Sequence, residues 1–137
     1  MSTSENNLAT AASYYQAMRN KDVTALSGHL HPDVSLLLPL AELSGKPAVV
    51  DAAARLMGLL LGLEIHAKFA VGNQVMLSYH IDFPEPIGLC RAASLMTFRY
   101  GLISRIELYY DARPFEKSLK KDAIFASAGP TNAASRR

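Results

Sequence analysis

Apolar residues in the first part of the chain recur at steps of three and four, the spacing of one face of a helix. The members of this stripe are Leu8, Ala11, Ala12, Tyr15 and Met18. The stripe predicts a helix over residues 4–20, with Ser4 as a candidate N-cap. A second, short helix is predicted over residues 23–30, starting near Asp22.

The pattern changes after these two helices. Pro32-Asp33 is a turn signal, and residues 34–38 form a short apolar run that ends at Pro39, which predicts a strand. The following stretch, "LSGKPAVVDAAARLMGLLLG", reads as a loop and a third helix with Pro47 in its first turn.

From Leu63 onward the apolar residues alternate with polar ones, which is the period of a strand. Four strands are predicted, over residues 64–71, 74–83, 88–100 and 102–111. The Gly72-Asn73 pair and Gly101 predict tight hairpin connections. The order of elements is therefore helix, helix, strand, helix and a four-stranded antiparallel meander, which predicts an α+β fold.

Composition narrows the class of protein. The 137 residues favour one domain, predicted over residues 1–115, with a partly helical or mobile tail over 116–137. The net charge of +2 is too small to indicate nucleic-acid binding, and the single Cys90 cannot form an intrachain disulfide. "MSTSENNLAT" does not resemble a signal peptide, and the longest apolar run, "LMGLLLGLEI", is about half of a membrane span. We therefore expect a soluble, cytoplasmic protein without nucleic-acid or membrane partners.

Four motifs resemble the nuclear transport factor 2-like superfamily in their order and spacing. They are "YYQAMRNKD", "HPDVSLLLP", "SGKPAVVD" and "MTFRYGLISRIELYYD", and together they cover about residues 8–115. The resemblance implies a cystatin-like architecture, in which a cone-shaped, curved antiparallel sheet wraps around helices and encloses a pocket. This fold hosts cyclases, isomerases, hydrolases and non-enzymes, so it does not fix the function.

The resemblance also implies candidate site residues. Tyr14 matches the helical tyrosine of ketosteroid isomerases, but Leu38 and Met96 stand where that group has its two acids, which argues against that isomerase activity. The SnoaL-like and limonene epoxide hydrolase-like branch fits better. There, "HID" places Asp82 on the middle-strand aspartate and His80 on the neighbouring arginine.

In the same comparison "YYD" places Asp111 on the aspartate that closes the last strand. The resemblance thus implies an acid–base pair of Asp82 and Asp111, oriented by His80, inside the pocket. Two carboxylates that share an apolar site would raise the pKa of one of them.

The residues alone leave the orientation of the second meander strand open. One face carries Met76, Ser78, His80 and Asp82, and the other carries Val75, Leu77, Tyr79 and Ile81; neither is plainly a solvent face. The resemblance places His80 and Asp82 inside. The alternative is that Asp82 only caps the turn before Pro84, and that Asp111 pairs with Arg113 or Arg105 at the surface.

The resulting hypothesis is a small pocket protein that acts on, or binds, a hydrophobic small molecule without a metal or an organic cofactor. Acid–base hydrolysis, isomerisation or cyclisation is the first reading, and a non-catalytic apolar-ligand-binding or dimeric scaffold module is the alternative. The predicted ligand contacts are Tyr14, Leu38, Met57, Met96 and Phe98. A homodimer is expected, because both faces of the predicted sheet carry apolar residues; Arg91, Thr97 and Arg99 are assigned to the paired, convex face.

Overall fold

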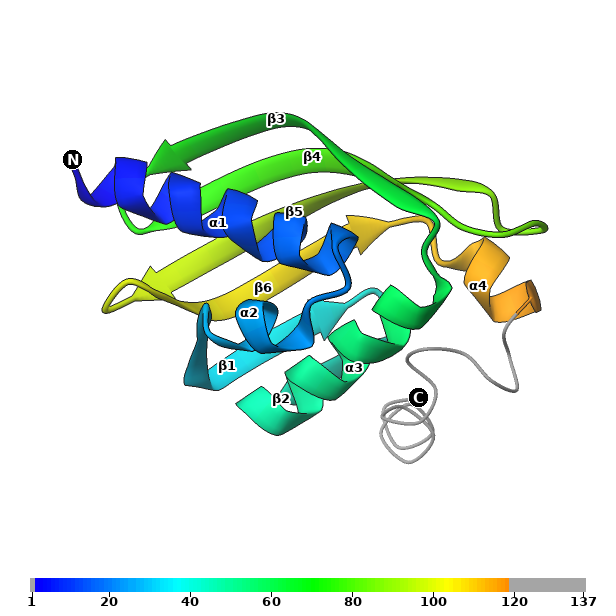
Figure 1. The fold of residues 1–137 in the computed structure, drawn as a ribbon, viewed down its shortest axis with the longest axis horizontal. Coiled ribbons are helices and arrows are strands. Elements are labelled where there is room, and N and C mark those ends of the chain that lie inside the picture. The colour runs from blue at the N-terminus through cyan, green and yellow to red at the C-terminus, as the bar shows by residue number, and fades with distance from the viewer. Residues whose placement is uncertain (1, 119–137) are drawn as a thin grey trace.

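The structure is a computed structural model that describes residues 2–118. One curved, six-stranded sheet is covered on one face by helices (Figure 1). The elements in chain order are α1 (Thr3–Arg19), α2 (Val23–Ser27), β1 (Leu30–Leu38), β2 (Ala41–Ser44), α3 (Lys46–Leu59), β3 (Gly62–Val71), β4 (Gln74–Asp82), β5 (Leu89–Arg99), β6 (Leu102–Tyr110) and α4 (Arg113–Ser118). The predicted α+β class is confirmed.

The helix starts follow local capping chemistry. The N-cap of α1 is Ser2, two residues before the predicted cap Ser4, because Ser2 and Glu5 form a reciprocal capping box. Ser4 instead donates a hydrogen bond to the Gly72 carbonyl at the β3–β4 turn. Asp22 caps α2 by accepting a hydrogen bond from the Ala25 amide, as its position in the sequence indicates.

The four-stranded meander forms as predicted, and the sheet order is β2-β1-β6-β5-β4-β3. Two features were not predicted. β2 forms a hairpin with β1, and β1 pairs in parallel with β6, which lies more than sixty residues later in the chain. β1 also starts earlier than predicted, at Leu30, and its pairing with β6 shifts register between Leu30 and Ser35.

The core lies between the concave face of the sheet and the helices (Figure 1). Tyr15 and Met18 of α1 and Val49 and Met57 of α3 pack on concave residues of the strands. The concave residues of β4, β5 and β6 are buried; they include Val75, Leu77, Tyr79, Ile81, Met96, Phe98 and Ile106. Burial of this apolar face is the main stabilising contribution to the fold.

Within the described residues, no helix is both long and apolar enough to cross a membrane. The predicted domain boundary at residue 115 falls inside α4. The remainder of the predicted tail, residues 119–137, lies outside the described residues.

Candidate functional site

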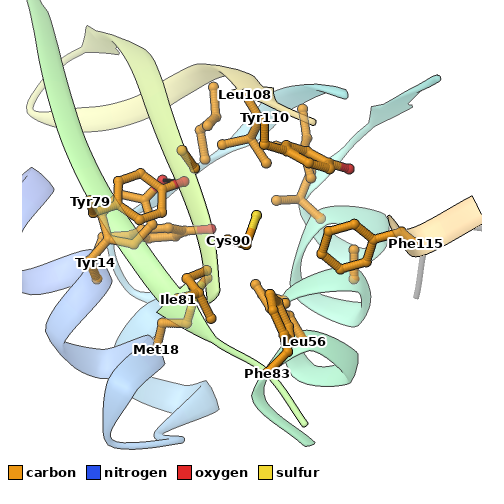
Figure 2. A pocket seen from close by; sticks show the side chains of 17 residues that line it. Tyr14, Met18, Leu56, Tyr79, Ile81, Phe83, Cys90, Leu108, Tyr110 and Phe115 are labelled. Atoms are coloured by element: carbon orange, nitrogen blue, oxygen red, sulfur yellow. Dashed lines mark hydrogen bonds between the residues drawn. The ribbon is translucent and has the colours of Figure 1, made fainter. Parts of the chain in front are cut away.

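A cavity of about 50 Å³ lies between the concave face of the sheet and α1, α3 and α4. The last residues of β4 and β6 and the first residues of β5 form its sheet wall, and α3 contributes small side chains such as Ala52 and Ala53. Figure 2 shows Phe83, Tyr110 and Phe115 around one end of this cavity and Tyr14 and Met18 toward the other.

The wall of the cavity is uncharged. Its polar groups are the hydroxyls of four tyrosines and the thiol of Cys90, and the rest of the wall is hydrocarbon; the tyrosines are Tyr14, Tyr15, Tyr79 and Tyr110. In the part of the chain that the structure describes, no Asp, Glu, His, Lys or Arg lines it. This composition fits an apolar molecule with few polar atoms.

Tyr14 places a hydroxyl group into the cavity. The residue is only 3% exposed, and Figure 2 shows its side chain reaching from α1 toward Cys90. Its hydroxyl is part of the cavity wall and takes no part in the hydrogen bonds of the neighbouring Tyr15. Burial, and secondarily the neighbouring Tyr15, raise the pKa of Tyr14, so the hydroxyl stays protonated and able to donate.

Tyr15 links α1 to the sheet through a buried network. Its Oη lies 3.0 Å from Tyr79 Oη and 3.0 Å from Ser94 Oγ. A hydroxyl has one proton, so Tyr15 donates one of these bonds and accepts the other. Burial raises the pKa of Tyr15 and of Tyr79, which keeps both phenols neutral. The network fixes α1 on the sheet and thereby fixes the adjacent Tyr14.

Cys90 lines the cavity rather than lying only in the core. Burial and the negative charge of Asp111 raise the pKa of its thiol. A protonated thiol is a weak nucleophile, so the group acts as a small, weakly polar part of the wall.

His80 and Asp82 do not face this cavity, and the face predicted for them was wrong. Burial along β4 alternates so that Tyr79 and Ile81 are inside and His80 and Asp82 are on the outer face. The physical reason is that Val75, Leu77, Tyr79 and Ile81 form the more apolar of the two sets, and that set buries more hydrocarbon. The residues alone left this orientation open, and the resemblance favoured the face that lies outside.

On the outer face, His80 forms a polar cluster with Asp82 and with His66, which sequence reasoning did not connect to it. His66 Nε2 lies 2.7 Å from His80 Nδ1, and His80 Nε2 lies 3.8 Å from Asp82 Oδ2. The short distance between the two imidazole nitrogens requires one to donate and the other to accept. Among the described residues, no group of three or more His, Cys, Asp or Glu is placed to hold a metal ion.

Asp111 ends the last strand, as predicted, but pairs with Arg113. Its Oδ1 accepts hydrogen bonds from the Arg113 backbone amide at 3.0 Å and from Arg113 Nε at 2.9 Å. Its Oδ2 accepts one from Arg113 Nη2 at 2.8 Å. These hydrogen bonds lower the pKa of Asp111 to about 2, the opposite of the raised pKa that an internal acid pair requires. The surface pairing that the sequence left open is the one observed.

Asp111 should therefore titrate in folded protein near pH 2, as measured by NMR of its side-chain carboxyl carbon. The unfolded value is about 3.9, so the ionised group stabilises the fold above that pH, and this contribution is lost as the pH falls toward 2. Arg113→Gln should move the pKa up toward about 3.9, while Arg105→Gln should leave it unchanged. A pKa of Asp111 above the unfolded value in the wild-type protein would contradict this prediction and support the internal acid pair.

Of the five predicted ligand contacts, Tyr14 lines the cavity. Met57 of α3 and Met96 and Phe98 of β5 are buried in the core but do not line the cavity. Leu38 lines shallow surface grooves beside the β1–β2 turn instead. Alternation gives the face of a side chain but not its depth along the cone, which explains these differences.

Sequence reasoning missed Phe83, Tyr110 and Phe115, which surround one end of the cavity (Figure 2). Signals for the first two were present, because Phe83 and Tyr110 continue the apolar alternation of β4 and β6. Phe115 lies beyond the last strand, where strand alternation no longer applies. The position of its side chain depends on the turn at Asp111.

Comparisons with known proteins agree with this architecture. Among solved structures, a protein from Kribbella flavida DSM 17836 has a TM-score of 0.77 at 22% identity, over 82% of this chain and 93% of that one. A nuclear transport factor 2-like protein from Cytophaga hutchinsonii ATCC 33406 has a TM-score of 0.68 at 20% identity, over 77% and 89%. TerC, co-crystallised with polyporic acid, has a TM-score of 0.70 at 18% identity, over 85% and 99%. At these identities the likeness shows the fold.

No curated protein matches the chain. The family model of the SnoaL-like domain matches residues 11–106, most of the helices and strands that form the cone. The SnoaL-like branch of the resemblance predicted from the four motifs is thereby confirmed: the chain, whose fold is that of a nuclear transport factor 2-like structure, belongs to the SnoaL-like domain family.

Proposed function

We propose that the protein binds a small apolar molecule in the cavity and that the Tyr14 hydroxyl donates a hydrogen bond to an acceptor atom of that molecule, such as a carbonyl oxygen. The observation that carries this proposal is the Tyr14 hydroxyl, which stays protonated, belongs to a side chain that is only 3% exposed and lines the cavity. A hydrogen bond from this hydroxyl to an acceptor of the ligand would contribute about 1 kcal/mol. That bond would give the site its polar specificity.

Binding is favoured over acid–base catalysis by the chemistry of the wall. General acid–base catalysis needs a group whose pKa lies near the working pH. The tyrosines and the thiol of the wall have raised pKa values, and the carboxylates of Asp82 and Asp111 lie outside it. A catalytic role for Asp82, Asp111 and His80 stays a prediction that the geometry does not favour. The crystal structure of TerC, which was co-crystallised with polyporic acid and shares this fold, is consistent with small-molecule binding.

The proposal is tested with two probes that differ by one atom position. A cavity of about 50 Å³ holds about three to five water-sized groups, since one water needs roughly 10–15 Å³. 2-Butanone and 2-methyl-1-butene have this size and the same shape, but only the ketone carries an acceptor. Tyr14→Phe should weaken 2-butanone binding about tenfold, the effect of one hydrogen bond, and should change 2-methyl-1-butene binding by less than about twofold.

Binding can be followed by NMR through the labelled methyl group of Met18, which lines the cavity. Tyr100→Phe is the matched control, because it removes the same hydroxyl from a side chain that is 91% exposed at the β5–β6 turn. Equal losses for both probes, or no loss for 2-butanone, would contradict the proposed role of Tyr14.

A further inference from the structure

The helix α4 is attached to the cone by one aromatic side chain. It follows directly after β6 and spans only Arg113–Ser118. Phe115 is 7% exposed, while its neighbours Arg113 and Glu116 are exposed and Pro114 is half-buried. Among residues 113–116 it is therefore the burial of Phe115 that holds the helix against the sheet.

The Phe115 ring occupies a slot made of two other rings. It packs edge-on against Phe83 at a centroid distance of 5.1 Å and against Tyr110 at 5.5 Å. Figure 2 shows Phe115 between these two side chains at the end of the cavity, and it forms part of the cavity wall. Edge-to-face contacts of this kind favour an aromatic group in the slot.

The volume of the cavity limits the size of the ligand that it can hold while Phe115 stays in place. An engineered apolar cavity of about 150 Å³ binds benzene, and this cavity, at about 50 Å³, has a third of that volume. A ligand with a ring therefore enters only if a wall side chain moves. The walls on β4, β5 and β6 belong to the paired sheet, whereas Phe115 belongs to a short helix at one end of it.

The turn before α4 can stay in place while Phe115 moves. Asp111 holds the backbone amide and the guanidinium of Arg113, so residues 111–113 are fixed beside the cavity. Asp111 in this arrangement is a positioning residue for α4. Movement is then confined to the part of the helix that follows Arg113.

We propose that Phe115 fills a ring-sized subsite of the cavity, and that a ligand with a flat ring binds by displacing Phe115 from between Phe83 and Tyr110. This inference rests on the proposed function and adds the chemical class of the ligand, a ring-bearing molecule with one acceptor. The ring packs between Phe83 and Tyr110, and the acceptor reaches the Tyr14 hydroxyl.

The test uses acetophenone and α-methylstyrene, which have the same ring and shape but differ in the acceptor. Phe115→Ala empties the subsite, so both probes should bind about ten- to hundredfold more tightly than to the wild type. That factor corresponds to the burial of one phenylalanine side chain that the ligand no longer has to displace. Phe115→Leu, which perturbs the packing less, should give a smaller gain for both.

Glu116→Ala is the matched control, because it changes an exposed neighbour in the same helix and should leave both affinities unchanged. Reduced or unchanged affinity of both probes in Phe115→Ala and Phe115→Leu would overturn the inference, since Phe115 would then be a wall that contacts the ligand. Absence of binding to every variant would overturn it as well. Failure of the proposed function has a different signature: both probes gain in Phe115→Ala, but Tyr14→Phe in that background does not discriminate between them.

Discussion

Replacing Leu77 by alanine is expected to lower the free energy of unfolding by about 2–5 kcal/mol. Leu77 is fully buried on the concave face of β4, where it packs in the core under the helices. The substitution removes buried hydrocarbon and leaves a cavity in the close-packed interior. The loss is a large fraction of the stability of a typical domain, about 5–15 kcal/mol. Urea unfolding should show a lower midpoint with an unchanged slope.

Ser78→Ala is the matched control on the neighbouring outward-facing position of β4. It should change the free energy of unfolding by less than about 0.5 kcal/mol, as surface substitutions usually do. If Ser78→Ala destabilised the protein as much as Leu77→Ala, β4 would present its other face to the core. His80 and Asp82 would then return to the interior.

The protein is expected to sediment as a homodimer through the outer face of the sheet, at twice the chain mass of 14.9 kDa. Phe69 and Met76 are paired across β3 and β4 and are 68% and 40% exposed. Leu95 continues this apolar row on β5. Monomeric proteins rarely expose large apolar patches, so this row favours contact with a second copy.

The double variant Phe69→Lys with Met76→Lys should sediment as a monomer at the same micromolar concentration, because two desolvated lysines per chain oppose association. Tyr100→Lys adds one charge at the β5–β6 turn and should stay dimeric. A clean monomer mass for the wild-type chain would contradict this prediction. Arg91 and Thr97, predicted for the convex face, do lie on the side of β5 opposite the cavity.

The local elements of the fold could be predicted because local chemistry determines them. The helix stripe of α1, the proline at the start of α3 and the glycine turns of the meander each act within a few residues. β2 is too short to show a period over its four residues. The parallel pairing of β1 with β6 joins distant segments, and no local pattern specifies such a pair.

The site was less predictable because it depends on orientation, depth and side-chain pairing. For β4, the residues alone left the inner face open, and the family resemblance favoured the face that the structure places outside. For Asp111, the partner was two residues away, at Arg113, and this local pairing outweighs a distant carboxylate. For Phe115, burial depends on Phe83 and Tyr110, which only the folded sheet brings together.

A crystal structure of the protein soaked with 2-butanone would show directly which face of the sheet binds the ligand. We expect the ketone inside the concave cavity, with its carbonyl oxygen about 2.7 Å from Tyr14 Oη, a hydrogen-bond distance. An empty cavity, or a ketone bound on the outer face beside His80 and Asp82, would contradict it.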